Sequence, residues 1–442
     1  MTPDLGARLA RAAADAPQLP GVVTPEGALD RAQLHRRMAG AAGTHHGELR
    51  LAPTDARVWL PWLAGGMRGG RLVRFDPGGV SEPPPESDAL PAPADAQTLC
   101  LAVQTSGSTG RPRALIRDRA AWLRCFAAEE AALGLCPVDR VLVLGAPTFS
   151  LTPYAALRAL HLGAPVGVLA QVTPDRAQAV LTTLRPTVVY GAPPLIRMLA
   201  RCAADRGVRA PVRRIISGGA RLTPVQAEAI RAAWPDAALT TFYGAAETSY
   251  VTLNPTPDGD DPADAGAPFD GVATAIAADG RLSVRTPYAA LAEEDAAGAW
   301  RPLADAAGWI TLADRAEVTA DGRLRLLGRA DARINAGGAL VDPTPLARAL
   351  ERLPWVAEAA VVALPDGRRS AAAAAVLVPD SGIPDEAART LRTVLPAPGE
   401  LAVPDRVLVL HGPAPRTAGG KLDARALADG LAAHTLAATA LA

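Results

Sequence analysis

The sequence predicts an α/β protein with three successive regions. Between residues 119 and 220, segments with helical periodicity alternate with short apolar runs, which is typical of a wound α/β sheet. From 251 to 328 the pattern changes to short β-like segments with Asp-Gly turns, and after Gly328 it changes again to a compact α+β pattern. We therefore expect a large N-terminal domain of wound α/β sheets with a small β-barrel-like subdomain, followed by a small α+β C-terminal domain.

The elements are expected in the following order along the chain. A Pro-rich run over 81–86 is interpreted as a linker, because proline locks φ and gives no N–H to a strand ladder. Helices are predicted at 5–14, 29–42, 120–133, 154–162, 175–184, 194–204, 343–353, 384–395 and near the C-terminus. Strands are predicted at 22–23, 57–60, 71–75, 99–103, 141–144, 166–169, 187–190, 214–217, 359–364, 373–378 and 407–410.

Composition excludes several classes of function. The chain has 442 residues, 49% of them hydrophobic, and its 45 basic residues balance 45 acidic ones, so no global field favours nucleic acid or a membrane surface. No basic region precedes an apolar run at the N-terminus, and no stretch long enough to cross a membrane occurs. The four cysteines and six histidines lack metal-ligand spacing, and we expect a cytoplasmic protein with reduced thiols.

The loop 105–110 is the first candidate site. Its residues are Thr105, Ser106, Gly107, Ser108, Thr109 and Gly110, and they follow a short apolar run. Small hydroxyl and glycine residues allow backbone N–H groups to close around phosphates, and Arg113 can add a cation. Taken alone, the loop also fits an ordinary surface turn, and it lacks the spacing of a P-loop.

Three further stretches carry candidate groups. Tyr243 can stack on a base, Gly244 allows close approach, and Glu247 can hold a metal with its nucleotide, although a Tyr-Gly turn before a strand is the simpler alternative. Asp314 can accept both hydroxyls of a ribose and Arg329 can reach the same sugar, although Asp314 alone fits a turn. Lys421 follows a double glycine, where a charge can enter a site or remain solvated.

In this order and spacing, these stretches resemble the adenylate-forming superfamily, which includes acyl- and aryl-CoA synthetases, luciferases and adenylation domains of peptide synthetases. The family patterns are TSGSTGxPK, YGxTE, TGD, GRxDxxIKxxGxxV and PRTxxGK. The chain has TSGSTGRPR, YGAAE, LAD, GRADARINAGGALV and PRTAGGK. The resemblance implies an AMP-binding N-terminal domain over 1–330, with the β-rich part at about 251–328, and a mobile C-terminal lid over 331–442 that turns about a hinge near Asp331.

The resemblance also implies a reaction in two steps. A carboxylate attacks ATP to give an acyl-AMP and pyrophosphate, and a nucleophile then takes the acyl group. By match, residues 105–110 and Arg113 hold phosphates, Glu247 ligates Mg²⁺, and Asp314 and Arg329 hold the ribose. Tyr243 stacks on adenine beside Gly218, Gly219 and Ala220, and Lys421 bridges the carboxylate and the α-phosphate. Rotation about the hinge presents a second-step loop that contains Asn335, Gly337 and Gly338.

The chain departs from the family pattern at four places. Arg113 and Asn335 replace lysines, Ala246 replaces a hydroxyl residue beside the α-phosphate, and residues 312–313 replace Thr-Gly before Asp314. The region before the loop is also short. An inactive nucleotide-binding relative and a structural phosphate-binding protein therefore remain alternatives to an active enzyme.

The expected acid pocket consists of Phe149, Ser150, Tyr190, Gly191, Ser217 and Ala245. Amino-acid-activating relatives have an Asp at the position of Ser150, and a buried ammonium without that partner is costly. We therefore expect an aryl or short acyl acid, with transfer to a thiol such as CoA. The alternative is a stand-alone adenylation enzyme that passes its acyl group to a carrier-protein phosphopantetheine or an amine, with an amino-acid substrate still open. Because no carrier domain follows Lys421, the acceptor is expected in trans.

Overall fold

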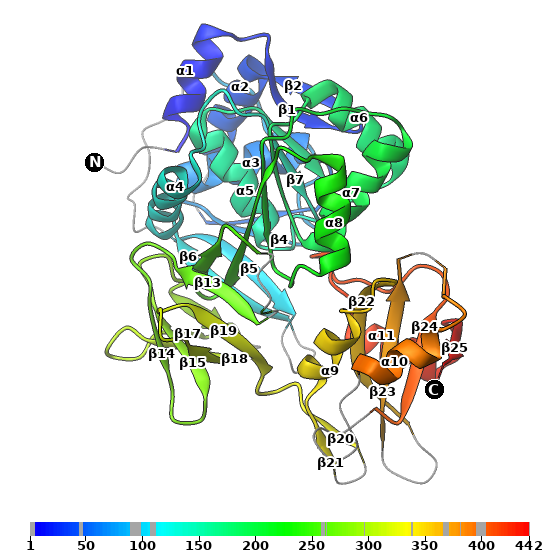
Figure 1. Ribbon diagram of the computed structural model, residues 1–442. Coiled ribbons are helices and arrows are strands. Elements are labelled where there is room, and N and C mark those ends of the chain that lie inside the picture. The colour runs from blue at the N-terminus through cyan, green and yellow to red at the C-terminus, as the bar shows by residue number, and fades with distance from the viewer. Residues whose placement is uncertain are drawn as a thin grey trace.

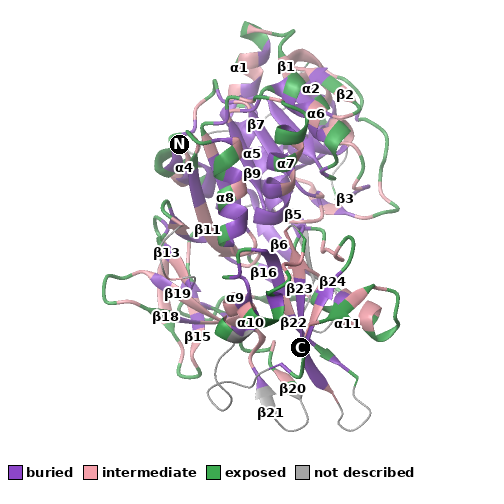
Figure 2. Cartoon of the chain, turned by 45° about the vertical axis from the view of Figure 1, so that its right-hand side comes forward, coloured by how far each residue is buried: buried purple, intermediate pink, exposed green. Residues whose placement is uncertain are grey.

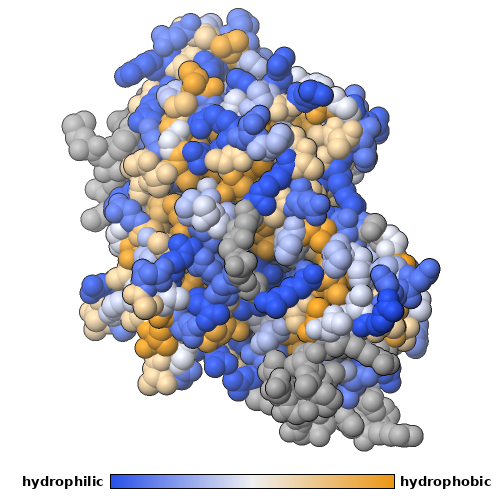
Figure 3. All heavy atoms as spheres, viewed as in Figure 1, coloured by the Kyte–Doolittle hydropathy of each residue, from blue (hydrophilic) through white to orange (hydrophobic). Residues whose placement is uncertain are grey.

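The computed structural model describes residues 5–43, 47–88, 99–106, 112–257, 261, 263–295, 297–336, 339–365, 371–380, 382–394 and 404–441. Side chains of residues 103–113 lie outside this description. Figure 1 shows a large N-terminal body, with a smaller C-terminal domain beneath its right-hand side. On the face seen in Figure 3, hydrophilic and hydrophobic residues are interspersed.

The central sheet runs through the whole N-terminal body. In the described residues it has 13 strands, and its pairing order is β14 (Ala273–Ile276), β15 (Arg281–Arg285), β18 (Ile310–Val318), β19 (Leu324–Arg329), β13 (Asp264–Pro268), β12 (Ser249–Asn254), β11 (Ala238–Ala245), β10 (Arg214–Gly218), β9 (Val188–Gly191), β7 (Val141–Leu144), β8 (Val166–Leu169), β1 (Pro20–Thr24) and β2 (Gly27–Asp30). Strands β11, β10, β9, β7, β8 and β1 pair in parallel. The expected β-rich region continues this sheet through β13, in an open order.

Helices cover both faces of the parallel strands. They are α1 (Ala7–Asp15), α2 (Arg31–Gly43), α3 (Ala56–Arg68), α4 (Arg119–Leu133), α5 (Leu151–Leu162), α6 (Pro174–Leu184), α7 (Pro193–Asp205) and α8 (Pro224–Ala233). In β7, Val143 packs in the core cluster with α3 and α5, whereas Leu142 and Leu144 pack in the cluster with α6 and α7. Burial on both faces explains why these strands are continuous apolar runs, and they appear purple in Figure 2.

The second sheet packs against α3 and α4. Its order is β17 (Trp300–Pro302), β16 (Ala292–Glu294), β6 (Pro112–Asp118), β5 (Leu99–Ser106), β4 (Leu72–Phe75) and β3 (Glu48–Leu51). Strands β5 and β6 pair antiparallel. Residues 107–111 between them, which include the centre of the phosphate-loop prediction, lie outside the described residues.

The C-terminal domain has its own sheet and core. Strands β20 (Ile334–Ala336) and β21 (Ala339–Val341) form a two-stranded ribbon, and helices α9 (Pro343–Leu350), α10 (Ala387–Val394) and α11 (Ala424–Ala432) follow along the chain. The four-stranded sheet has the order β22 (Val356–Leu364), β23 (Ala372–Pro379), β24 (Arg406–Leu410) and β25 (Ala438–Ala440). No helix in the described ranges is long and apolar enough to span a membrane.

Several local predictions were wrong or incomplete. Residues 57–60 lie in α3 instead of a strand, because Asp55 caps the helix by accepting a hydrogen bond from the Arg57 N–H at 2.8 Å. The supposed linker packs on the N-terminal helices, where the Trp62 indole donates to the Glu82 carbonyl at 2.9 Å and Arg36 pairs with Glu86 at 2.7 Å. Helix α8 and strands β2, β3, β6, β11, β20, β21 and β25 were not predicted.

Candidate active site between the two domains

A cavity of about 860 Å³ lies at the carboxyl ends of β10 and β11 and is closed by the C-terminal domain. This is where ligands bind in wound α/β sheets. The predicted site residues that line it come from both domains: Phe149, Ser150, Gly219, Ala220, Tyr243, Gly244, Ala245, Ala246, Glu247, Asp314, Arg329, Asp331 and Lys421. Folding therefore brings together residues that are far apart in the sequence.

Tyr243, Asp314 and Arg329 form one corner of the cavity. The Tyr243 hydroxyl donates to Asp314 Oδ2 at 2.9 Å, and Asp314 and Arg329 are directly paired across β18 and β19. Burial raises the pKa of Tyr243 well above its ordinary value, and the neighbouring Asp314 charge acts in the same direction, so the phenol remains a donor at neutral pH. The second oxygen of Asp314 is not used in this hydrogen bond, which leaves an acceptor for a ligand hydroxyl.

Glu247 lies on the turn between β11 and β12. Its backbone carbonyl accepts a hydrogen bond from the Ala290 N–H at 2.7 Å, and the buried Arg117 donates to the carbonyl of the preceding Ala246. Among the described residues, no group of three or more His, Cys, Asp or Glu could hold a metal ion. A single carboxylate here is compatible with Mg²⁺, which usually retains waters and binds phosphate oxygens.

The Lys421 loop is fixed by Arg416. The guanidinium pairs with both oxygens of Glu358 at 2.7 and 3.1 Å, and its Nη1 also donates to the Gly420 carbonyl at 2.8 Å. A side chain at Gly419 would place its Cβ 2.8 Å from the Phe149 ring. The glycine therefore lets the Lys421 loop approach the N-terminal wall of the cavity.

The Lys421 side chain lies among many protein atoms at the domain interface but is exposed to water. Desolvation by the surrounding protein lowers the pKa of Lys421, the Asp314 charge raises it, and the Arg329 charge lowers it further. Both charged neighbours belong to the ribose-site prediction, so Lys421 and that corner act on one another electrostatically.

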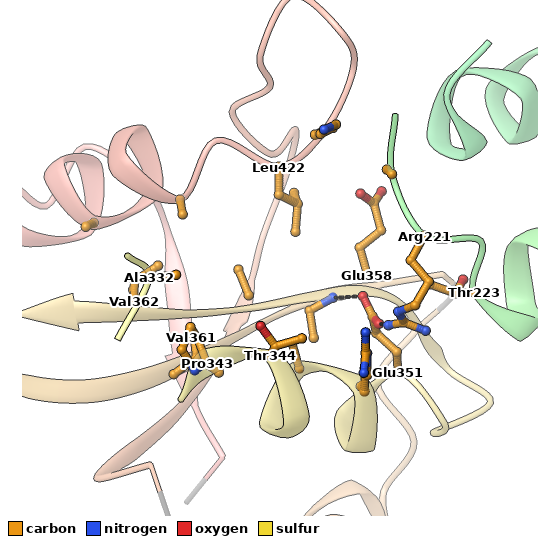
Figure 4. A pocket seen from close by; sticks show the side chains of 18 of the residues that line it. Arg221, Thr223, Ala332, Pro343, Thr344, Glu351, Glu358, Val361, Val362 and Leu422 are labelled. Atoms are coloured by element: carbon orange, nitrogen blue, oxygen red, sulfur yellow. Dashed lines mark hydrogen bonds and ion pairs between the residues drawn. The ribbon is translucent and has the colours of Figure 1, made fainter. Parts of the chain in front are cut away.

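Ion pairs hold the C-terminal domain against this site. Arg221, directly after Ala220, pairs with Glu351 at the end of α9, and Figure 4 shows the two side chains pointing toward one another in a second cavity of about 590 Å³. The Thr223 hydroxyl donates to the Ala357 carbonyl at 3.1 Å, and Arg201 pairs with Asp380 at 2.9 Å. These contacts join the C-terminal domain to the N-terminal body beside Lys421, which lines both cavities.

Other predicted site residues lie elsewhere. Tyr190, Gly191, Ser217 and Gly218 do not line the cavity in the described residues, and a Cβ at Gly218 would lie 2.2 Å from the Phe242 ring. Asn335 is exposed on β20 and faces Leu340 across the ribbon. The side chains of Thr105, Ser106 and Arg113, and residues 107–110, 337 and 338 entirely, lie outside the described residues.

The sequence prediction missed an aromatic lining. Trp122 on α4, Tyr154 on α5, Phe242 on β11 and Tyr250 on β12 all line the cavity, as does Arg117, whose guanidinium lies 5.5 Å from the centre of the Trp122 ring. The only signal in the sequence was the position of Phe242 and Tyr250 on either side of the Tyr243–Glu247 motif.

Two protein-family models match the chain. The model described as AMP-binding enzyme matches residues 52–287, and the model described as AMP-binding enzyme C-terminal domain matches residues 347–421. The first match covers all of β11 and the Glu247 turn, and the second ends at Lys421.

The chain is also similar to individual proteins. It is 31% identical over 304 residues to an uncharacterized acyl-CoA ligase of Bacillus subtilis, covering 65% of the chain and 59% of the relative. It is 28% identical over 356 residues to the 3-hydroxybenzoate-CoA ligase of an Aromatoleum species, covering 75% of the chain and 66% of that relative. In each case less than two thirds of the relative is spanned.

Among solved structures, the amide bond synthetase McbA from Marinactinospora thermotolerans has the same fold, with a TM-score of 0.74 and 22% identity over 96% of this chain and 99% of that one. The cavity geometry, the paired motifs and the two family matches agree. This chain belongs to the AMP-binding enzyme family.

Proposed function

We propose that the chain activates a carboxylic acid with ATP, releasing pyrophosphate and forming an acyl-AMP, and then transfers the acyl group to a thiol such as CoA. The observation that carries this proposal is the presence of Lys421 in one cavity with Tyr243, Glu247 and Asp314. The transfer of an adenylyl group to an acid requires a cation, a carboxylate that binds the metal and a carboxylate that binds the sugar.

In this proposal the nucleotide lies along the β18–β19 side of the cavity. Asp314 and Arg329 hold the ribose hydroxyls, and Tyr243 stacks on adenine while its hydroxyl fixes Asp314. Gly219 and Ala220 border the base, with Gly218 behind them outside the cavity lining. Residues 105–110 with Arg113 hold the β- and γ-phosphates. The acid oxygen attacks the α-phosphorus, the bond to the pyrophosphate oxygen breaks, and Lys421 offsets the charge on the reacting oxygens.

Glu247 is the residue that would hold Mg²⁺. The ion supplies charge compensation for the phosphates when bound. Arg117 and Ala290 donate to the carbonyls of Ala246 and Glu247, so they hold the backbone that carries this carboxylate.

The acid is proposed to lie against Phe149, Ser150 and Ala245, with Tyr190, Gly191 and Ser217 behind this wall. An aryl or short acyl acid is supported by Ser150, which offers no charge to a substrate ammonium, and by the name of the 3-hydroxybenzoate-CoA ligase.

A thiol acceptor is supported by the names of the two CoA-ligase relatives. The name of the amide bond synthetase favours an amine as the second candidate acceptor, and a carrier-protein phosphopantetheine remains the other thiol. The acceptor is proposed to arrive in trans, and Asn335, Gly337 and Gly338 to form the loop that receives it.

We further propose that the domains divide at 330/331 and that the C-terminal lid turns about Asp331 between the two steps. Asp331 pairs with Arg329 through two contacts of 2.8 Å, so the hinge is connected directly to the ribose corner. A cytoplasmic location is proposed because Cys125, Cys136 and Cys202 are free thiols.

ATP–pyrophosphate exchange with a panel of aryl, short acyl and amino acids tests the activation step. Exchange that depends on an aryl or acyl acid supports the proposal, and exchange with amino acids alone contradicts the acid assignment. Nucleotide binding without any exchange identifies an inactive relative. Adding CoA, a pantetheinylated carrier protein or an amine to the active mixture, and identifying the product by mass spectrometry, distinguishes the acceptors.

A further inference from the structure

A carboxylate lies buried behind the aromatic lining of the large cavity. Glu129 on α4 has a relative exposure of 0% and accepts hydrogen bonds from three tyrosine hydroxyls. Tyr250 and Tyr190 donate to its Oε1 at 2.7 and 2.8 Å, and Tyr154 donates to its Oε2 at 2.9 Å. One side chain thus joins a helix to α5, β9 and β12.

The charge of Glu129 is balanced by Arg158 on α5. The Arg158 Nε lies 3.3 Å from Glu129 Oε2, and both side chains are almost completely buried. Burial is the largest single influence and lowers the pKa of Arg158, but the charge of Glu129 together with smaller contributions from Tyr190, Tyr154 and Glu130 raises that pKa above its ordinary value. Burial and the Glu129 charge also raise the pKa of Tyr190 and Tyr250, so their hydroxyls stay protonated and continue to donate.

Two of the three tyrosines are part of the cavity wall. Tyr154 and Tyr250 border the cavity with exposed fractions of only 4% and 2%, and Glu129 is not among its described lining residues, so the network of hydroxyls and carboxylate lies behind the lining. The Tyr250 ring stacks on Phe242 with centroids 4.2 Å apart, and the Tyr154 ring meets Trp122 edge-on at 5.4 Å. The two tyrosine rings are themselves 5.7 Å apart.

The wall therefore has a fixed geometry. Four rings from α4, α5, β11 and β12 form a continuous series, and offset or edge contacts of this kind are favoured by aromatic groups. Burying a charged pair is expensive compared with an apolar packing of the same volume. What the pair adds here is orientation, because one carboxylate aligns hydroxyls from three elements.

We propose that Glu129 is a positioning residue that, through Tyr154 and Tyr250, fixes the aromatic wall of a pocket for a planar aryl carboxylic acid. This inference rests on the proposed function for the identity of the cavity and adds the substrate class. The partly exposed Phe242 ring supplies a flat apolar face on which an aryl group can stack. The nearly buried Tyr250 ring, itself packed against Tyr154, fixes the plane of that face through its stack on Phe242.

The test compares the chain with Tyr250→Phe, which removes one hydroxyl and keeps the ring. Its matched control is Tyr288→Phe, because Tyr288 is also buried and its hydroxyl donates to the Asp270 carbonyl at 2.7 Å, outside the cavity lining. Binding of benzoate, with propionate for comparison, is measured by calorimetry in the absence of nucleotide. The KM values for benzoate and ATP are measured separately by pyrophosphate exchange.

We expect the wild type to bind benzoate at least tenfold more tightly than propionate. Tyr250→Phe should weaken benzoate binding and raise its KM by roughly threefold to tenfold, with the KM for ATP within twofold, because only the wall is loosened. Tyr288→Phe should lower the melting temperature about as much as Tyr250→Phe does, and its affinity for benzoate should stay within twofold of the wild-type value. The double variant Glu129→Gln/Arg158→Met, which removes both buried charges, should reproduce the benzoate effect of Tyr250→Phe.

The outcomes separate this inference from the proposed function. If no acid supports exchange, the proposed function fails, while benzoate binding still tests the wall. Equal benzoate binding by the wild type and Tyr250→Phe, equal effects of Tyr250→Phe and Tyr288→Phe, or no benzoate binding by the wild type would each overturn the inference, even if exchange with another acid is observed.

Discussion

Replacing Arg416 with glutamine should slow adenylation without weakening nucleotide binding. The side chain makes three hydrogen bonds: two to the Glu358 carboxylate and one to the Gly420 carbonyl, next to Lys421. A hydrogen bond from a charged donor contributes about 1.5–3 kcal/mol. If the bond to Gly420 alone controls the position of the Lys421 ammonium, its loss should lower kcat roughly tenfold to a hundredfold, since each 1.36 kcal/mol corresponds to a factor of ten.

The effect on stability can be separated from the effect on position. Glu358→Gln also breaks the buried ion pair, but it keeps the bond from Arg416 to Gly420, so its kcat should fall less than that of Arg416→Gln. Arg389→Gln removes an exposed pair with Glu386 in the same domain and serves as the control. The assay is acid-dependent ATP–pyrophosphate exchange, with melting temperatures measured in parallel. If Arg416→Gln lowers the melting temperature and leaves kcat unchanged, the Arg416 hydrogen bonds serve only stability and the reasoning is wrong.

Three further predictions concern the charged corner of the cavity. Lys421→Ala should lower the rate of exchange by about 10²–10³ while leaving ATP binding nearly intact, and unchanged exchange would contradict the role of this ammonium. Because desolvation lowers the pKa of Lys421, the active charged form is lost as pH rises through that lowered value. The apparent pKa of the alkaline limb of the kcat profile should therefore lie below the ordinary pKa of lysine, and it should move to higher pH in Lys421→Arg. Equilibrium nucleotide binding measured across the same pH range serves as the control. Asp314→Asn removes the charge that accepts from Tyr243 and should raise the KM for ATP about tenfold or more, with kcat changed less; a larger loss in kcat than in KM would place Asp314 in the chemical step.

The wound sheet could be predicted because each of its central strands is a continuous apolar run that can be recognised in the sequence by itself. The apolar runs at β7, β8, β9 and β10 are buried on both faces, and Gly, Pro and Asp residues mark the connections between them. The strand prediction at 57–60 was wrong because an apolar pattern this short is compatible with either a helix or a strand. The structure resolves it through the cap at Asp55, a single local hydrogen bond. The linker prediction for the Pro-rich run was wrong because composition indicates only the backbone conformations available to a segment. It does not show whether another part of the protein offers a surface on which the segment packs, as Trp62 does for Glu82.

The charged part of the candidate site was predictable for a related reason. Asp314 and Arg329 face one another across two adjacent strands, and the Tyr243–Glu247 and Lys421 stretches each combine chemistry-bearing residues with glycines that permit close approach. Each motif is local, so its residue types can be recognised before its partners are known. The contact between Arg416 and Glu358 was not recognised because the two residues are 58 positions apart and Glu358 lies in an ordinary strand pattern.

The proposed acid pocket could not be predicted in this way. Its rings come singly from α4, α5, β11 and β12, and the carboxylate that aligns them is 121 residues from Tyr250. At each of these positions the local pattern indicates only a buried residue, and Glu129 looks like one of several acidic residues on a helix. Only packing shows that three hydroxyls reach the same carboxylate. The part of the site proposed to bind the nucleotide can therefore be inferred from local motifs. The part proposed to select the acid depends on contacts between distant elements, so substitutions there should change acid specificity without altering any recognisable motif.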